Sequence, residues 1–288
     1  MSFEISPARP GEWTRIVRWA AAEGWNPGRY DVEHFLTQDP HGFLLGREDG
    51  EAVSAISVVN YSLDYAFLGF YLVRPDRRGQ GLGIATWKAG MAHAAGRSVG
   101  LDGVPDQQDN YRRSGFLPAY TTIRHSGVPS TGTGTGTCTD ANVAGDGTVP
   151  ATGVDPRLLG GLDAACHPAD RHGFATRWAA DPRHVTRVRF RDGQLTGYGV
   201  LRPAEDGLRI GPLLATSPRD AEALLGALLV EAGREKVSID IPEPHRRARE
   251  IAERFGLAPS STTARMYTGP IRSLQHSVGY GVMSLELG

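Results

Sequence analysis

An internal repeat constrains the fold of this chain more than any other feature of its sequence. Two pairs of landmarks recur on either side of a segment rich in glycine and threonine: Asp39-Pro40 with Asp181-Pro182, and Asp49-Gly50 with Asp192-Gly193. The densest match has no gap, since Arg113, Gly115, Pro118, Thr121, Thr122 and Arg124 find identical residues at Arg254, Gly256, Pro259, Thr262, Thr263 and Arg265. We therefore expect a duplicated unit, with a related fold in each half.

The segment between the two copies is expected to be a linker. Residues 127–153 contain almost no large apolar side chain, so they can add little to a core. The chain has 288 residues, more than one typical domain of about 100 to 200 residues. The sequence thus predicts a first domain over residues 1–127, a flexible linker over 128–153 and a second domain over 154–288. The alternative, a phosphate-binding loop in the Gly-Thr run, lacks the preceding strand and the following Lys-Ser or Lys-Thr.

Each copy has the pattern of an α+β unit. In the first copy, Trp13, Ile16, Val17 and Ala20 share one face of a helix expected over residues 13–23. Asp49-Gly50 suits a tight hairpin turn between two antiparallel strands. A third strand over residues 67–73, a helix after residue 83, and further strand, helix and strand segments complete the unit. The second copy repeats this order.

Charge and composition exclude several classes of partner. With 31 basic and 32 acidic side chains, the formal charge of −1 does not favour nucleic acid or an anionic membrane. No stretch approaches the roughly 20 apolar residues of a membrane helix, so the expected location is the cytoplasm. Cys138 and Cys166 lack the spacing of a zinc or redox site, and we expect both to be reduced, with no metal bound.

A glycine-rich turn in the first copy has the features of an anion site. A strand ending at Val73 leads into a turn with Gly79, Gly81 and Gly83, and a helix follows directly. Glycines allow a diphosphate to approach the backbone, and the free N–H groups and the dipole at the helix N-terminus attract it. The spacing fits neither the dinucleotide fingerprint nor a Walker loop. The alternative is a glycine-rich loop that merely turns the chain.

Here the sequence resembles the GNAT superfamily of N-acetyltransferases. The family motif is Arg or Gln, two residues, Gly, one residue, then Gly or Ala, which Arg78 to Gly83 match in full. The resemblance implies tandem GNAT-like domains, each with a mixed, mainly antiparallel sheet flanked by helices, and acetyl-coenzyme A or another acyl-coenzyme A as co-substrate. Backbone N–H groups of the loop would hold its pyrophosphate, and the strand end would pair with its pantetheine arm. The implied cofactor-binding residues are Leu72, Val73, Arg78, Gly79, Gln80, Gly81, Leu82 and Gly83.

A second family pattern points to Tyr111 as the general acid. Tyr111 begins the Tyr-three-residues-Gly-Phe pattern that places a phenol near the cofactor sulfur in many relatives. When an amine attacks a thioester, a phenol with an ordinary pKa of about 10 can protonate the departing thiolate. The alternative is a tyrosine that simply packs on its helix. The chain departs from the family at Val104 and Gln107, where Asn and Ala are usual, so details of pantetheine binding are open.

The proton acceptor is less clearly marked. Residues 67–73 contain no carboxylate where many relatives have one. Asp102 ranks first because it follows a strand whose end should face the site. Asp106, Asp64 and Glu23 come next, although each could be a turn, cap or surface residue.

The acceptor amine should meet a different segment. Trp25 and Asn26 lie between the first two helices, in a segment that often covers the acceptor pocket in this superfamily. We take both as expected substrate-binding residues. Trp25 is equally consistent with a buried core aromatic.

The second copy lacks both functional patterns. Ala252 takes the place of Tyr111, and residues 215–220 replace the glycine loop. We expect this copy to be degenerate and to wall the acceptor pocket, with residues 279–287 forming a final strand that ties the halves together. Stretches in both copies, including residues 23–28, 101–104 and 197–200, are similar to the two-domain YitH-like group of GNAT proteins.

The sequence therefore predicts an acyl-coenzyme A dependent N-acyltransferase. The expected reaction moves an acyl group, acetyl above all, to a primary amine of a small molecule. Two alternatives stay open: a non-catalytic acyl-coenzyme A sensor, or a protein N-acetyltransferase. The sequence does not indicate an oligomeric state.

Overall fold

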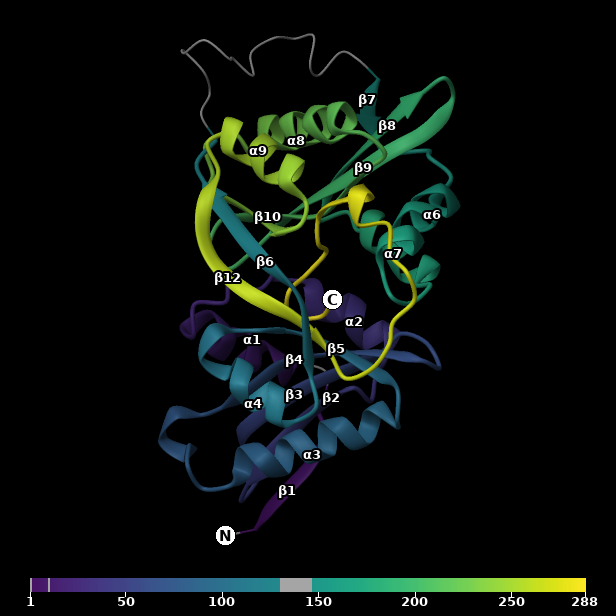
Figure 1. Ribbon diagram of the computed structural model, residues 1–288. Coiled ribbons are helices and arrows are strands. Elements are labelled where there is room, and N and C mark those ends of the chain that lie inside the picture. Colours follow the sequence, from purple (N-terminus) through teal and green to yellow (C-terminus); the bar gives the residue numbers. More distant parts are fainter. Residues whose placement is uncertain (1, 10, 130–146) are drawn as a thin grey trace.

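The two halves of the chain contain the same elements in the same order (Figure 1). The computed structural model describes residues 2–9, 11–129 and 147–288. The first half comprises β1 (Phe3–Pro7), α1 (Trp13–Ala22), α2 (Asp31–Gln38), β2 (Phe43–Glu48), β3 (Glu51–Asn60), β4 (Tyr65–Val73), α3 (Leu82–Ala94), β5 (Ser98–Gly103), α4 (Gln108–Arg113) and β6 (Leu117–Gly127). The second half comprises β7 (Thr148–Pro150), α6 (Pro156–Cys166), α7 (His172–Ala179), β8 (Val185–Arg191), β9 (Gln194–Pro203), β10 (Leu208–Ala215), α8 (Pro218–Ala232), β11 (Val237–Pro242), α9 (Arg246–Arg254) and β12 (Ala258–Tyr267), followed by β13 (Gly279–Gly281). The predicted α+β class and the tandem arrangement are confirmed.

Local sequence explains several of these elements. The four residues predicted to share a face of the first helix are the buried residues of α1. Asp49 and Gly50 have φ angles of 48° and 86° between β2 and β3, and Asp192 and Gly193 have φ angles of 50° and 75° between β8 and β9. Left-handed conformations of this kind form tight hairpin turns. Both hairpins are thus set by the repeated Asp-Gly pair.

The sheets of the two halves are joined by an exchange of their last strands. The strand order is β1-β2-β3-β4-β5-β12-β6-β11-β10-β9-β8-β7, with β13 paired to β10. β12 of the second half therefore pairs with β5, and β6 of the first half pairs with β11. β6 and β12 also pair with each other, and Figure 1 shows them running side by side between the halves.

Two matching ion pairs mark this exchange. In the pairing of β12 with β5, Arg265 faces Asp102. In the pairing of β6 with β11, Arg124 faces Asp240. Arg124 and Arg265 are identical partners in the repeat. Each half therefore places an arginine on its exchanged strand against an aspartate of the other half.

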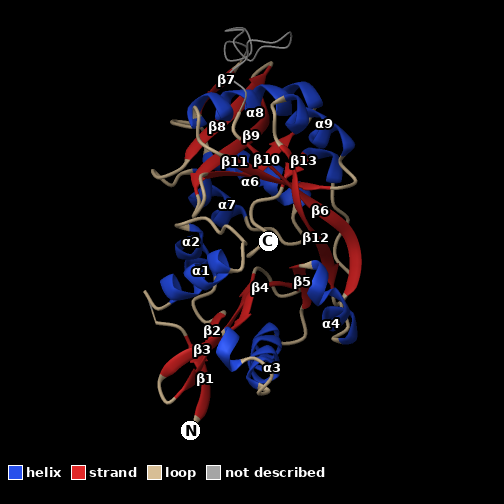
Figure 2. Ribbon diagram, turned by 90° about the vertical axis from the view of Figure 1, so that its left-hand side faces the viewer, coloured by secondary structure: helices blue, strands red, loops and turns tan. Residues whose placement is uncertain are grey.

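Helices cover the joined sheet and share one central core. α1, α2, α7 and α6 follow one another along one side of the molecule (Figure 2). Their aromatic residues meet between the halves, where the ring of Phe35 in α2 lies 4.8 Å from that of Phe174 in α7. Smaller apolar clusters pack under α3 and under α8 and α9. In the part of the chain that the structure describes, no helix is both long and apolar enough to cross a membrane.

Two stretches differ from the sequence-based expectations. Most of the expected linker, including Cys138, lies outside the described residues, but Thr148–Pro150 at its end form β7 and pair with β8. The expected final strand over residues 279–287 is wrong in extent, because only Gly279–Gly281 pair as a strand. The residues after β13 run back towards β4. A Cβ at Gly69 would lie 1.6 Å from the Glu286 carbonyl oxygen, so glycine permits this close approach.

Candidate active site

The site begins where β4 and β5 separate. Their parallel pairing is confined to Tyr65–Phe67 and Ser98–Gly100. Farther along β4, Phe70 and Tyr71 stand opposite Ile56 alone, and Phe70 has a φ angle of 45°. This bulge bends β4 away from β5. Leu72 and Val73 follow the bulge and pair with Ala55 and Ser54 of β3. Their role in binding an extended arm stays a prediction.

The glycine loop lies at the end of β4. Gly79 and Gly81 have φ angles of 78° and 82°, which favour glycine. Gly81 is the N-cap of α3, and no side chain among the described residues caps it. The first N–H groups of α3, which begins with Leu82 and Gly83, lack partners within the helix. The loop thus has the backbone donors that a diphosphate requires.

The side chains of the loop lie at its rim. Arg78 donates from Nε to the carbonyl oxygen of Val73 at 3.0 Å, and its Nη2 binds a carboxylate oxygen of Glu23. Gln80 donates to the carbonyl oxygen of Asp76 at 3.4 Å. Arg78 therefore connects the end of β4 to the end of α1.

A cavity of about 230 Å³ opens beside the bulge. Both halves of the chain line it. The first half contributes Glu23, Gly24, Trp25, Leu68, Gly69, Phe70, Tyr71, Leu101, Asp102, Val104, Pro105, Tyr111 and Arg124, and the second half contributes Ser261, Thr262, Thr263, Leu285 and Glu286. Three of the predicted site residues, Trp25, Asp102 and Tyr111, are thus brought together. Asn26 is not among the described residues that line the cavity.

Tyr111 presents a neutral phenol to this cavity. Its ring stacks on Trp87 with centroids 5.7 Å apart and meets the edge of Phe116 at 6.3 Å. Burial raises the pKa of Tyr111 above its ordinary value of about 10, and neighbouring Tyr71 raises it further. The phenol is therefore protonated and held in place by aromatic packing.

Asp102 is not the free carboxylate that its position at a strand end predicted. Its oxygens accept from Arg265, from Nη2 at 2.6 Å and from Nε at 3.1 Å, and its side chain is fully buried. Burial raises the pKa of Asp102 against the opposing attraction of Arg265. In the other half Asp240 accepts from Arg124 at 2.7 Å and 3.1 Å in the same way. Because the half without the glycine loop keeps this pair, the geometry favours a structural role over proton transfer.

The other candidate carboxylates differ in whether they line the cavity. Asp64 is exposed in the bend before β4, and Asp106 is exposed in a short 3-10 helix, Pro105–Gln107, before α4. Glu23 lines the cavity. Glu286, which the sequence reasoning missed, also lines it, but its oxygens accept from Arg209 at 2.9 Å and 3.0 Å. No local pattern identifies Glu286, because the residues that hold it are distant in sequence.

Arginines from both halves, Arg124 in β6 and Arg209 in β10, fix the loop between α1 and α2. The Trp25 carbonyl oxygen accepts from Arg124 Nη1 at 2.6 Å, and the Asn26 carbonyl oxygen accepts from Arg209 Nη1 at 3.0 Å. The Asn26 side chain exchanges hydrogen bonds with the backbone of Asp206, at 3.0 Å and 2.7 Å. Asn26 therefore anchors the loop, whereas Trp25 forms part of the cavity wall. Arg209 and Asp206 are thus how the second half helps to hold this loop in place.

The equivalent cleft of the second half is filled by β13. β10 and β11 pair only at Leu208–Ile210 and Val237–Ile239 and then separate, as β4 and β5 do. β13 pairs with β10 at Leu213 and Leu214, and Val282 N–H donates to the Asp240 carbonyl oxygen of β11 at 2.9 Å. The space that remains there is about 50 Å³. The chain itself thus occupies the position that the first half leaves open.

The helix that follows this second cleft is also closed to anions. Ser217 is the N-cap of α8, and its hydroxyl accepts from the Asp220 N–H at 3.2 Å. The Asp220 carboxylate lies in the first turn and pairs with Arg191 at 2.8 Å. A side-chain cap and a negative charge replace the open glycine turn of α3. These differences explain physically why the second copy is degenerate.

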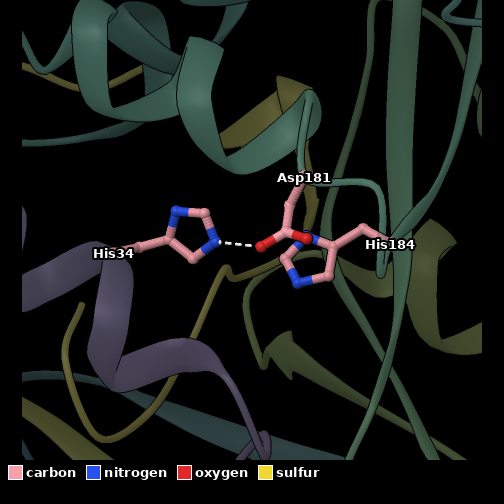
Figure 3. Close-up of side chains that lie close together, drawn as sticks. All are labelled: His34, Asp181 and His184. Atoms are coloured by element: carbon pink, nitrogen blue, oxygen red, sulfur yellow. Dashed lines mark hydrogen bonds and ion pairs between the residues drawn. The ribbon is translucent and has the colours of Figure 1, made fainter.

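Figure 3 shows a further cluster, at the contact between the halves. His34 comes from α2, whereas Asp181 and His184 come from the turn between α7 and β8. Their possible metal-ligand atoms lie within 4.8 Å of one another. His34 Nε2 lies 2.6 Å from an oxygen of Asp181. The cluster therefore connects α2 to the second half.

The repeat favours a structural role for this cluster over a metal site. Both oxygens of Asp181 already accept from Arg183, at 2.9 Å and 2.6 Å. Asp39, the matching residue in the repeat, binds His93 at 2.8 Å. The same aspartate turn thus holds a histidine in both halves, and the contact needs no ion to explain it.

Of the two cysteines, Cys138 lies outside the described residues. Cys166 is a free thiol within the described part of the chain. Burial raises the pKa of its thiol to about 12. The thiol is therefore protonated at neutral pH, and a protonated thiol is a poor nucleophile and metal ligand.

Comparisons with known proteins agree with this architecture. An acetyltransferase (GNAT) family model matches residues 11–116, and an acetyltransferase (GNAT) domain model matches residues 160–281. The two matches fall on the two halves that the repeat defines. Holothin acyltransferase from Pseudoalteromonas sp. (strain SANK 73390) is 32% identical over 294 residues, covering 100% of this chain and 95% of that protein.

Solved structures share the fold of the whole chain. A protein from Pyrococcus horikoshii matches with a TM-score of 0.79 at 21% identity, covering 99% of this chain and 96% of that one. A tandem GNAT protein from the clavulanic acid biosynthesis pathway matches with a TM-score of 0.63 at 16% identity, covering 93% and 99%. The assignment to the YitH-like group stays a prediction. The matches to both halves and the full-length relative show that this chain belongs to the GNAT family of acetyltransferases.

Proposed function

We propose that the protein is an N-acyltransferase that moves an acetyl group from coenzyme A to the primary amine of a small molecule. Acyl-coenzyme A is the usual co-substrate of the GNAT family. The observation that carries the proposal is that the β4 bulge and Tyr111 line one cavity, while the open glycine loop follows the end of the same strand. The proposed place of action stays the cytoplasm expected from the sequence.

The proposed reaction is direct attack. The amine nitrogen forms a bond with the thioester carbon, and the bond from that carbon to sulfur breaks. The departing thiolate takes the Tyr111 proton, which solvent then replaces, while the amine loses a proton to an acceptor. Backbone N–H groups of the loop hold the pyrophosphate, and Leu72 and Val73 bind the pantetheine arm along the open edge of β4. An aromatic pocket and burial keep the phenol protonated for this step.

A small acceptor fits the site better than a protein chain. The cavity holds about 230 Å³ and is lined by residues of both halves. The loop over it is anchored by Arg124 and Arg209, so opening the cavity for a polypeptide would break these hydrogen bonds. The relative that matches over the whole chain is named holothin acyltransferase, and we take this name as support for a small-molecule acceptor.

Calorimetry and a turnover assay test the proposal together. Acetyl-coenzyme A should bind to the purified full chain, and coenzyme A thiol should be released when amines of a broad small-molecule panel are added. Absence of both binding and release would refute the proposal. Binding without release from any amine, or acetylation of peptide amines alone, would instead favour a sensor or a protein acetyltransferase.

A further inference from the structure

Three carboxylates line the cavity within the described part of the chain, and they are not equivalent. Asp102 is held by Arg265, and Glu286 is held by Arg209. Both arginines are almost completely buried, with side-chain exposures of 5% and 1%. Removing a carboxylate from such a partner would leave a buried charge without compensation. Asp102 is therefore committed to an ion pair between the halves, and Glu286 to an ion pair within the second half.

Glu23 differs from these two in its position and its partner. It follows the last residue of α1 and lines the cavity, and its side chain is 37% exposed. Its partner is Arg78, whose side chain is 50% exposed and belongs to the glycine loop. A pair this exposed contributes little to folding, roughly 0.2–1 kcal/mol. It can therefore open without disturbing the fold.

Among the residues that the structure describes, Arg78 is the side chain that connects Glu23 to the glycine loop. It begins the glycine loop and reaches back to the Val73 carbonyl oxygen and to Glu23. A diphosphate held on the loop carries more negative charge than one carboxylate, and a guanidinium binds phosphate oxygens in the same forked geometry. The co-substrate and Glu23 therefore compete for Arg78.

The repeat distinguishes the Glu23–Arg78 pair from the aspartate–arginine pairs that join the halves. Counted from the match of Asp39 with Asp181, Ala165 takes the place of Glu23 in the second half. The conserved structural pairs of Asp102 and Asp240 with their arginines occur in both halves, but the Glu23 pair occurs where the glycine loop and Tyr111 occur. This distribution is that of a functional feature.

We propose that Glu23 accepts the proton of the attacking amine, and that Arg78 holds it until the co-substrate occupies the glycine loop. The inference rests on the proposed function. When Arg78 turns to the diphosphate, the Glu23 carboxylate is released at the wall of the cavity that also contains Tyr111. The amine then loses its proton to Glu23 as its nitrogen bonds to the thioester carbon, and Tyr111 supplies a proton to the sulfur. Proton transfer is thereby coupled to loading of the site.

A binding experiment tests the proposed competition between Glu23 and the co-substrate for Arg78. Coenzyme A affinity is measured by calorimetry on the full chain and on Glu23→Gln, Arg78→Gln and the double variant. Glu23→Gln should bind coenzyme A about two- to fivefold more tightly, because Arg78 is no longer held. Arg78→Gln should bind more weakly, and adding Glu23→Gln to it should change nothing further. Unchanged affinity in Glu23→Gln would overturn the competition.

A turnover experiment tests the proposed proton transfer to Glu23. With an amine that the wild type accepts, and with saturating acetyl-coenzyme A, Glu23→Gln should transfer about 10²-fold more slowly. Added formate should partly restore transfer in Glu23→Ala, since a small carboxylate can take the vacant place. Glu51→Gln is the matched control, because Glu51 forms a comparable exposed pair with Arg74, at 3.4 Å. It should leave both affinity and rate unchanged.

The outcomes distinguish this inference from the proposed function. A Glu23→Gln rate within about threefold of an active wild type would overturn the role of Glu23 and leave the acyltransferase proposal standing. A wild type that binds coenzyme A but transfers to no amine would remove both. A formate-insensitive Glu23→Ala would contradict proton transfer by the carboxylate.

Discussion

At the scale of single residues, the packing of Tyr111 gives the most direct test of chemistry. Tyr111→Phe keeps the ring against Trp87 and Phe116 and removes only the hydroxyl group. We expect unchanged affinity for acetyl-coenzyme A and a turnover about 10²-fold slower, since the thiolate would lose its proton donor. Calorimetry and thiol release measure the two quantities. Equal turnover in the two proteins would assign Tyr111 a packing role.

The same burial predicts the behaviour of the rate at alkaline pH. Burial raises the pKa of Tyr111 above its ordinary value of about 10, so the phenol keeps its proton where a free tyrosine would begin to lose it. The rate should therefore show no falling limb between about pH 8 and about pH 10. A pH–rate profile, with circular dichroism to confirm folding at each pH, measures this. A decline in that range with the fold intact would contradict the assignment.

Asp102 gives a residue-scale test of structure. Asp102→Asn leaves the guanidinium of Arg265 buried without its counter-charge, so we expect a loss of about 3–5 kcal/mol in the free energy of unfolding. Denaturant titration measures it. Asp240→Asn is the matched variant on the other side of the exchange and should also destabilise strongly, since Asp240 holds both Arg124 and Arg209. Slow turnover without loss of stability in Asp102→Asn would restore its role as proton acceptor.

The sequence predicted those features that depend on residues nearby in the chain. Gly79 and Gly81 need left-handed backbone angles where a strand meets a helix, and that requirement is local. Tyr111 was found through its spacing to Gly115 and Phe116. The contacts that hold Asn26 and Asp102 could not be predicted, because their partners, Asp206 and Arg265, are distant in sequence. Spacing alone does not show which strand will lie beside another.

At the scale of elements, the role of the turn before α3 as an anion site can be tested by comparing it with the turn between β2 and β3, which has a similar backbone conformation. No described atom lies within 4 Å of a Cβ at either Gly81 or Gly50, and their φ angles are 82° and 86°. Gly81→Ala and Gly50→Ala should each cost about 1 kcal/mol of stability through backbone strain. Only Gly81→Ala should weaken acetyl-coenzyme A binding, by calorimetry. Equal affinities in the two variants would argue against the loop as the anion site.

The order of elements was predictable, but the pairing of the last strands was not. Periodicity and Asp-Gly turns indicate helices and hairpins whose partners are adjacent in sequence. β12 could pair with β5 or with β11 on that evidence, because its alternation fits either neighbour. The alternation of residues 279–287 likewise suggested a long strand, whereas β13 ends at Gly281 and the chain turns towards β4. Long-range packing decides these features.

At the scale of the whole molecule, the exchange of strands predicts that neither half folds by itself. Residues 1–129 alone would expose the edges of β5 and β6 that β12 and β11 cover in the full chain. We expect each half, expressed separately, to aggregate or remain unfolded, and co-expressed halves to form a one-to-one complex. Gel filtration and circular dichroism measure this. A folded, monomeric first half would contradict the structural importance of the exchange.

The exchange also has a consequence for how the two halves can evolve. Two identical subunits of a homodimer must accept every substitution twice, at both ends of the symmetry axis. In this protein the two interlocked halves belong to one polypeptide, so each position can vary independently of its counterpart in the other half. The ion pairs at the interface are alike in the two halves, whereas β13 fills the cleft of the second half and the cleft of the first half stays open. A tandem chain of this kind can specialise one half as scaffold while the two halves stay joined.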